Sequence, residues 1–389
     1  MLKIKKFLHR NIYPIFFYFL PIKNKKVVFS SYAGKQYSDN PRAISEKLHE
    51  MYPEVDIVWL MNDSEKTKYK LPYYIRVIEN ESLSAAYELY TAKVWVDNCR
   101  KPLFFKKRKG QKYIQTWHGT PLKLIEADAG DKLGKRYRRY AKRDTKNMDL
   151  LISGNEHSTS IFKRAFEYKG EILESGTPRN DLLLRLSQEI SLKVREKLGY
   201  TNEKLILYAP TFRNDFNKNG ISQLEQLNPI EVLNSFEEKF DKKCILLLRF
   251  HPNVANKIDK DSILSKYEGR VLDVSMNWDM QELLCASDVL ITDYSSVFFD
   301  YSILCRPIFI FTPDKNDYCN ERGLYFDIKE LPICSAESSS QLINQILAED
   351  EDKLKYRTVS LLEQIGNKES GNASLKIIEI IMKYIKTKN

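Results

Sequence analysis

The chain has 389 residues, of which 43% are hydrophobic and 29% charged, and it contains no low-complexity tract. This composition excludes a disordered chain, and the length suits two domains, each long enough to bury a core of its own. The formal net charge of +10 favours an anionic partner, such as a phosphate compound, a membrane surface or a nucleic acid.

The six cysteines contain no Cys-x-x-Cys pair and lie mostly in or beside apolar runs. They are expected to be small buried hydrophobes, so neither a zinc site nor a disulfide framework is predicted. Histidines and carboxylates show no spacing that fits a metal site. The sequence also has no Gly-x-Gly-x-x-Gly and no Walker loop, so we expect neither a metal nor a bound cofactor.

The first segment in chain order, residues 1–22, is basic and then aromatic. Four basic residues and no acid occur within 1–10, and the apolar run at 12–22 is broken by Pro14 and Pro21. This run is about half as long as the ~20 residues of a membrane-spanning helix. No small-residue cleavage site follows, which disfavours a signal peptide. Two interpretations stay open: a segment lying in the membrane interface, or an element packed on the protein itself.

Two further basic runs lie in the first half of the chain. Residues 100–112 carry seven Lys or Arg and no acid, and residues 131–146 carry eight against two acids. Each run alone fits a solvated helix face. Together with the basic N-terminal segment, however, they favour a surface that attracts anions.

Short apolar runs alternate with helical stretches along the chain, which is typical of parallel sheets covered by helices on both faces. One series of runs lies at 27–29, 56–60, 94–96, 113–116, 150–153 and 171–173, and a second at 205–208, 245–248, 271–274, 289–292 and 308–311. We therefore predict an α/β protein with two doubly wound parallel-sheet domains. From about Ser340 the chain is predicted to be helical, with breaks near Gly366 and Gly371.

Polar clusters follow these runs at the same end of each predicted strand. Open parallel sheets bind ligands beyond the carboxyl ends of their strands. If the two sheets face each other across a cleft, both sets of polar residues point to one site. The pattern thus predicts catalysis between the domains.

Two histidines stand just beyond predicted strands, one in each half of the chain. His118 follows the run at 113–116, in a turn with two small residues, a proline and a lysine, and His251 follows the run at 245–248. An imidazole with an ordinary pKa of about 6.5 can take a proton from a hydroxyl at neutral pH. His118 is therefore a candidate base.

The second half also offers groups for an anion. Ser295 and Ser296 follow the run at 289–292 and open a helix, where backbone N–H groups can bind an anion, although ordinary helix capping also accounts for serines there. Asp300 lies one turn further on and can accept hydrogen bonds from a ligand hydroxyl.

Arginines just past strand ends suit bidentate contacts to a diphosphate. The three that fit are Arg179, Arg213 and Arg249, with Thr211 and Lys123 as further candidates.

Five motifs in order resemble the CDP-glycerol glycerophosphotransferase family of teichoic acid synthesis, over roughly residues 25–375. They are Gln-Thr-Trp-His-Gly-Thr-Pro-Leu-Lys (115–123), Gly-Thr-Pro-Arg-Asn-Asp (176–181), Tyr-Ala-Pro-Thr-Phe-Arg (208–213), Arg-Phe-His-Pro-Asn (249–253) and Ile-Thr-Asp-Tyr-Ser-Ser-Val-Phe-Phe-Asp (291–300). The resemblance implies a two-domain GT-B-like fold. We expect a membrane-interface segment at 1–22, an acceptor-side domain at 23–185 and a donor domain at 186–389.

The resemblance also implies roles for residues at matching positions. His118 looks like the general base on the acceptor side, and His251 is placed to engage the donor diphosphate. The implied substrate contacts are Gly119, Thr120, Pro121, Lys123, Arg179, Thr211, Arg213, Arg249, Ser295, Ser296 and Asp300.

The implied reaction is transfer of sn-glycerol 3-phosphate from CDP-glycerol to a hydroxyl of a polyprenyl-diphosphate-linked glycan acceptor, with release of CMP. The expected place is the cytoplasmic face of the cell membrane, as a peripheral protein. The chain lacks the long extra N-terminal domain of the processive polymerases, which suggests the short members that add a priming, second or subsequent unit. The alternatives are a GT-B glycosyltransferase that uses a nucleotide sugar and, in another class, a basic membrane- or nucleic-acid-binding protein; we expect no nucleic-acid partner.

Overall fold

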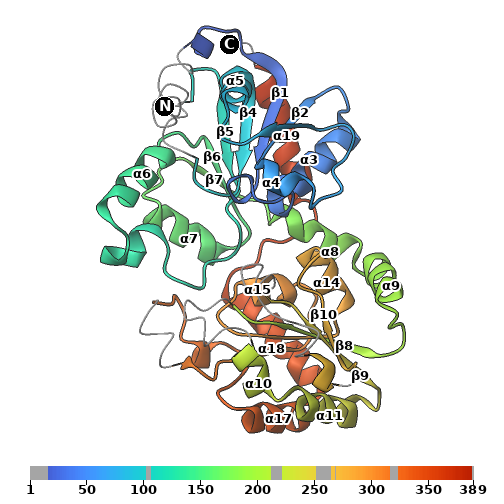
Figure 1. The fold of residues 1–389 in the computed structure, drawn as a ribbon. Helices are drawn as coiled ribbons and strands as arrows, with labels where there is room; N and C mark the ends of the chain where they lie inside the picture. Colours follow the sequence, from blue (N-terminus) through green and yellow to red (C-terminus); the bar gives the residue numbers. More distant parts are fainter. Residues whose placement is uncertain are drawn as a thin grey trace, which may run out of the picture. The chain divides into compact units, whose positions relative to one another are not determined.

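The computed structural model describes residues 16–101, 107–211, 221–250, 264–267, 269–315 and 323–387. Contacts within the chain define two compact units, each built on one parallel sheet (Figure 1). Unit 1 comprises the described parts of residues 1–118, 125–181 and 368–389. Unit 2 comprises those of residues 119–124 and 182–367.

Unit 1 contains a seven-stranded sheet in the order β3-β2-β1-β4-β5-β6-β7. Its strands are β1 (Lys23–Ser30), β2 (Asp56–Met61), β3 (Arg76–Glu79), β4 (Ala92–Asp97), β5 (Lys112–Gln115), β6 (Leu150–Ser153) and β7 (Glu171–Glu174), and all the pairings are parallel. The chain runs outward from β1 in one direction and from β4 in the other. The order therefore reverses between β1 and β4, which is where open parallel sheets leave a crevice for ligands.

Helical elements of unit 1 connect most of these strands, and two more follow β7. They are η1 (Tyr32–Gly34), α3 (Asp39–Met51), α4 (Asp63–Lys66), α5 (Leu83–Thr91), η2 (Glu126–Lys132), α6 (Lys135–Thr145), α7 (Glu156–Ala165), η3 (Pro178–Asn180) and α19 (Ala373–Lys386).

Unit 2 contains a six-stranded parallel sheet in the order β10-β9-β8-β11-β12-β13. Its strands are β8 (Lys204–Ala209), β9 (Cys244–Leu248), β10 (Val271–Asp273), β11 (Val289–Thr292), β12 (Ile308–Phe311) and β13 (Cys334–Ala336). Helix α8 (Asp181–Arg185) begins at the boundary between the units. The further helices of unit 2 are α9 (Ser187–Leu198), α10 (Ile221–Leu227), α11 (Pro229–Phe240), η5 (Ser265–Tyr267), α14 (Met280–Ala286), α15 (Val297–Ser302), η6 (Ile328–Glu330), α17 (Ser339–Ala348) and α18 (Glu351–Gln364). The strand order reverses between β8 and β11.

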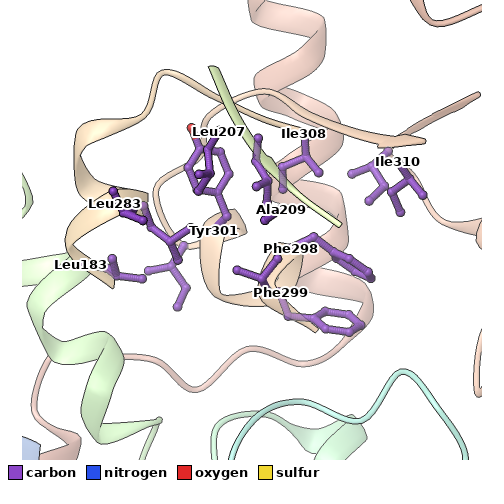
Figure 2. Packing of buried hydrophobic residues seen from close by; sticks show 14 of the residues in the cluster. Leu183, Leu207, Ala209, Leu283, Phe298, Phe299, Tyr301, Ile308 and Ile310 are labelled. Atoms are coloured by element: carbon purple, nitrogen blue, oxygen red, sulfur yellow. The ribbon is translucent and has the colours of Figure 1, made fainter. Parts of the chain in front are cut away.

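The sheet of unit 2 separates two hydrophobic clusters, because successive strand residues point to opposite faces. Leu205 and Leu207 of β8 belong to one cluster, whereas Ile206 and Tyr208 belong to the other. Figure 2 shows part of the first cluster, in which Leu207 lies among side chains of α15 and β12. Burial on both faces explains why these strands read as continuous apolar runs, and it confirms the predicted α/β fold class.

Each predicted run overlaps an observed strand, with Thr116 and Val274 one residue beyond the ends of β5 and β10, but the edge strands β3 and β13 were not predicted. Their sequences, Arg-Val-Ile-Glu and Cys-Ser-Ala, are short and carry polar residues. An edge strand pairs on one side only, and so it does not need the continuous apolar run that marks an interior strand.

The predicted C-terminal helices are present as α17, α18 and α19, but they are divided between the units. Helix α19 packs with β1, β4 and α3 in unit 1, and its apolar side chains Ile377 and Ile381 are fully buried there. Figure 1 shows this red helix among blue elements from the start of the chain. The contacts thus place the unit boundaries after Asp181 and Asn367, whereas the sequence assigned all of residues 186–389 to one domain.

No helix within the described ranges is long and apolar enough to cross a bilayer. Cys99, Cys244, Cys285, Cys305 and Cys334 are free thiols, each buried or half-buried.

Candidate functional site

His118 lies three residues beyond β5, at a tight bend in unit 1. Trp117 before it adopts a positive φ of 52°, and Gly119 after it has φ of 142°. Both values lie where residues with a Cβ are strained, and at Gly119 the conformation favours glycine. The bend turns the chain sharply and holds the histidine at the strand end.

The imidazole of His118 has a defined hydrogen-bond partner. Its Nδ1 lies 2.7 Å from the carbonyl oxygen of Asn98, which follows β4. A carbonyl oxygen can only accept, so Nδ1 carries the proton and Nε2 of the neutral ring keeps its lone pair. The ring stacks on Trp117 with centroids 4.2 Å apart and lies 5.6 Å from the ring of Tyr32. The sequence-predicted base therefore has its Nε2 available.

Burial of the His118 ring lowers its pKa, since desolvation disfavours the charged imidazolium. The Asn98 carbonyl and the carboxylate of Asp39 act in the opposite direction, and the guanidinium of Arg179 lowers the pKa further. The result is a pKa below the ordinary histidine value, so the ring is neutral and able to accept a proton at neutral pH.

Asp39 is the centre of a buried network beside His118. Its Oδ1 accepts from Arg179 Nη1 at 2.7 Å and from the backbone N–H of Asn40 at 2.7 Å, while its Oδ2 accepts from Asn98 Nδ2 at 2.6 Å. Asn98 also donates to Ser31 Oγ at 3.2 Å, across the point where the strand order reverses. The side chains that follow β1 and β4 are thereby joined at the strand reversal of unit 1.

The part of the motif at 115–123 that follows His118 belongs to unit 2. The Leu124 N–H donates to Gly323 O at 2.9 Å, the Tyr325 N–H donates to Leu122 O at 2.8 Å, and Lys123 bridges Leu324 in antiparallel register. The predicted contacts Gly119, Thr120, Pro121 and Lys123 are all in this segment, with Thr120 and Pro121 buried. The motif thus passes from one unit to the other directly after His118.

Thr211 and Asp293 meet at the strand reversal of unit 2. Thr211 follows β8, Asp293 follows β11, and these two strands are neighbours. Both the N–H and the Oγ1 of Thr211 donate to the buried carboxylate of Asp293, with the N–H at 2.9 Å from Oδ1 and Oγ1 at 3.1 Å from Oδ2. The pair fixes the backbone where such sheets bind ligands.

The other predicted donor-side residues that the structure describes lie at the same end of this sheet. Half-buried Ser295 accepts from the Val297 N–H at 3.3 Å, and Ser296 stands at the N-cap position of α15 without a side-chain cap bond. Asp300 is buried in α15 and accepts from Gln281 Nε2 at 3.3 Å.

Two predicted arginines have different surroundings. Arg249 follows β9 in unit 2 and donates from Nη1 to Val274 O at 2.7 Å. Arg179 lies in unit 1 and pairs with Asp39, and its charge acts on His118. His251 and Arg213 lie outside the described residues.

The sequence did not single out Asp39, Asn98 or Asp293 as site residues. Asp39 begins α3 with a positive φ of 63°, and Asn98 contributes a backbone oxygen. Neither the backbone conformation of Asp39 nor the carbonyl contact of Asn98 can be predicted from the type of residue. For Asp293, its place directly after a predicted strand, ahead of Ser295, was the usable signal.

Two parallel α/β sheets, each with its chemistry-bearing side chains beyond the strand reversal, define a GT-B-like α/β fold. The chain belongs to the CDP-glycerol:poly(glycerophosphate) glycerophosphotransferase family, whose model matches residues 12–383.

Its relatives include teichoic acid poly(glycerol phosphate) polymerases of two Bacillus species. The Bacillus subtilis (strain 168) protein is 37% identical over 94% of this chain, which spans about half (49%) of that protein's length. The Bacillus spizizenii (strain W23) protein is 36% identical, with 93% of each chain covered. A teichoic acid glycerol-phosphate transferase of Staphylococcus aureus (strain NCTC 8325) is 35% identical, covering 98% of this chain and 99% of its own.

A solved structure of the wall teichoic acid polymerase TagF matches with a TM-score of 0.85 at 33% identity, covering 99% of this chain and 95% of that chain. A histidine variant of TagF soaked with CDPG matches with a TM-score of 0.84. A UDP-bound MnaA from S. aureus, at 13% identity and a TM-score of 0.55, shares the fold alone.

Proposed function

We propose that the chain transfers glycerol phosphate from CDP-glycerol to a hydroxyl of a polyprenyl-diphosphate-linked teichoic acid precursor and releases CMP. The observation that carries the proposal is the environment of His118, whose Nδ1 is occupied by Asn98 O at 2.7 Å and whose pKa is lowered by burial. Membership of the glycerophosphotransferase family supports the choice of donor.

In the proposed step, the acceptor hydroxyl oxygen attacks the phosphorus that bears glycerol. The new O–P bond forms as the bond from that phosphorus to the bridging oxygen breaks, and the bridging oxygen leaves with CMP and the electron pair. The hydroxyl proton passes to Nε2 of His118. A neutral hydroxyl is a poor nucleophile, so a positioned base of this kind contributes about 10²–10⁴-fold in rate.

Unit 2 supplies the donor-binding groups in this proposal. Ser295, Ser296 and the start of α15 provide donors for the diphosphate, and Asp300 provides an acceptor for a donor hydroxyl. Thr211, whose N–H and hydroxyl both donate to Asp293, provides a hydroxyl oxygen that can accept. Arg249 adds positive charge for the departing CMP. His251, Arg213 and the segment with Gly119, Thr120, Pro121 and Lys123 complete the proposed substrate contacts.

We place the protein at the cytoplasmic membrane surface, as a peripheral protein. Helix α6 supports this, because its exposed side chains include Lys135, Arg136, Arg138 and Arg139 and would attract anionic lipid. Within the segment 16–22, Phe16 and Phe19 are exposed at 67% and 81%. Sedimentation with vesicles of phosphatidylglycerol, but not of phosphatidylcholine, at low salt is the expected result.

Incubation of the protein with a lipid-linked acceptor analogue and CDP-glycerol tests the reaction. The expected result is CMP release together with an acceptor mass increase of one glycerol phosphate or more. Transfer from a nucleotide sugar in its place would point to a glycosyltransferase. Polynucleotide binding without CMP release would point to a basic binding protein.

The relatives include a polymerase, a transferase and a primase that are each covered over 90% or more of their length, so length alone does not separate priming from extension. Acceptors that carry zero or one glycerol phosphate distinguish these activities. A primase elongates only the bare acceptor, whereas a transferase or polymerase elongates the acceptor that already carries one unit.

A further inference from the structure

The base His118 lies beside two buried groups of opposite charge that are paired with each other. The side chains of Asp39 and Arg179 are 4% and 9% exposed, and they meet at 2.7 Å. They come from α3 and from η3, which are 140 residues apart in the chain. Such a pair is costly to desolvate, and hydrophobic residues of similar volume would often stabilise a fold as well. Its place beside the base suggests a use other than stability.

The two charges act on His118 in opposite directions. Proton transfer turns the ring into an imidazolium, which a nearby carboxylate stabilises and a nearby guanidinium destabilises. Burial raises the pKa of Asp39, but the charge and the hydrogen bond of Arg179, together with His118 and the Tyr32 hydroxyl, lower it by more. Asp39 is therefore a carboxylate at neutral pH. The carboxylate connects to the ring through one residue, since Asn98 donates to Asp39 Oδ2 and accepts from His118 Nδ1.

Two other titratable groups face the ring. Asp97, at the end of β4, acts in the same direction as Asp39, but it is paired with Lys101 at 2.6 Å. Tyr32 presents its ring to His118, and burial raises the pKa of its hydroxyl, so it stays neutral. Asp39 and Arg179 therefore supply the opposing charges that act on the ring, whereas the charge of Asp97 is offset by Lys101.

We propose that Asp39 and Arg179 are opposing positioning residues for His118: Asp39, acting through Asn98, favours the protonated ring and fixes the Nδ1–H form, and Arg179 limits that effect. The proposal rests on the function proposed above for His118. It assigns Arg179 to control of the base, in place of a contact with the donor diphosphate.

Two substitutions that each break the Asp39–Arg179 ion pair test the proposal, because they should shift the pKa of His118 in opposite directions. Titration of ¹³C-labelled histidine rings by NMR follows the protonation of each ring, and a His118→Gln variant identifies the His118 signal among those of the five histidines. Asp39→Asn should lower the pKa of His118 and Arg179→Gln should raise it, each by ~0.5–1.5 units, the size expected when one charge near a buried ring is removed. Asn suits position 39 because it tolerates the positive φ found there.

Arg179→Lys is the matched control, because it keeps the positive charge and should leave the pKa of His118 near the wild-type value. The acid limb of kcat/KM should move in the same directions as the NMR values: to lower pH in Asp39→Asn and to higher pH in Arg179→Gln. Asp39→Asn should also lower kcat on the plateau, since a weaker base accepts the proton less well.

Shifts of the same sign in both variants, or none, would overturn the proposal and leave the ion pair a structural contact. If Asp39→Asn does not fold, the comparison of Arg179→Gln with Arg179→Lys still decides. The NMR titration needs no substrate. A failure of CDP-glycerol turnover in the wild-type protein would therefore contradict the proposed function without deciding this inference.

Discussion

Nδ1 of His118 lies 2.7 Å from the backbone carbonyl of Asn98, and this contact determines which ring nitrogen is available for chemistry. Because the partner is a backbone oxygen, substitution of the Asn98 side chain does not remove it. Asn98 itself is held by Asp39, Ser31 and the Tyr32 N–H. The orientation of the ring therefore depends on the residues that follow β1 and β4 and on Asp39.

Replacing His118 with Ala should lower kcat by about 10²–10⁴-fold, because the acceptor hydroxyl loses its base. The affinity for CDP-glycerol should change little, since the proposed donor groups lie in unit 2. CMP release under saturating substrates and calorimetric titration of CDP-glycerol measure the two quantities.

His49→Ala is the matched control, because His49 lies on α3 and stacks on Tyr74 at 3.6 Å, away from the network around Asp39. Its turnover should equal that of the wild-type protein. A His118→Ala enzyme with wild-type turnover would rule out the role as base.

The acid limb of the pH–rate profile should fall below pH ~6.5, the ordinary histidine value. Burial lowers the pKa of His118, and only the neutral ring accepts a proton. Activity should thus persist as the pH drops to 6.5 and be lost as the pH falls through the lowered pKa. Measurement of kcat/KM between pH 5 and pH 8 checks this, and a limb centred above pH 7 would contradict it.

The interior strands could be predicted from the sequence because burial on both faces leaves continuous apolar runs, as in β8 and β11. Edge strand β3 could not be predicted, because its residues are at most partly buried and so form no continuous apolar run. The position of α19 could not be predicted either: an apolar helix face shows that it packs on something, but not on which sheet.

At the site, the position of His118 at a strand end could be predicted from the sequence, because an apolar run comes directly before this residue. The partners of His118 could not be predicted, because they come from segments that lie far apart in the sequence. Arg179 reaches Asp39 across 140 positions, and Asn98 contributes a carbonyl that every residue carries. Sequence patterns of residue type hold no information on such contacts.

Asp293→Asn should raise the KM for CDP-glycerol several-fold. The carboxylate accepts both the N–H and the Oγ1 of Thr211, and an amide offers only one oxygen for these two donors. A hydrogen bond to a charged acceptor contributes about 1.5–3 kcal/mol, so the end of β8 should loosen where the donor is proposed to bind.

Asp288→Asn is the control for this substitution. Asp288 precedes the same strand, β11, and accepts from the Leu205 N–H at 2.9 Å at the opposite end of β8. It should lower stability without changing the KM for CDP-glycerol. An equal KM in Asp293→Asn and the wild-type protein would show that the Thr211 pairing has no part in donor binding.

Asp181→Ala should destabilise the attachment of α19 to unit 1. The Asp181 carboxylate accepts from the N–H groups of Ala373 and Ser374, both at 2.8 Å, and so caps a helix that begins 192 residues later. Loss of an N-cap typically costs about 0.5–2 kcal/mol. Hydrogen exchange of the peptide 373–386 should therefore accelerate by ~2–30-fold, as expected for that cost when exchange occurs through local opening.

Asp350→Ala provides the comparison, because Asp350 caps α18 locally through the Lys353 N–H at 2.7 Å. That substitution should accelerate exchange in 351–364 and leave 373–386 unchanged. The Asp181 substitution should do the reverse, since its carboxylate holds the start of α19 and makes no cap for α18. Faster exchange in both segments for either variant would mean that α18 and α19 open together, and would contradict a separate attachment of α19 through Asp181.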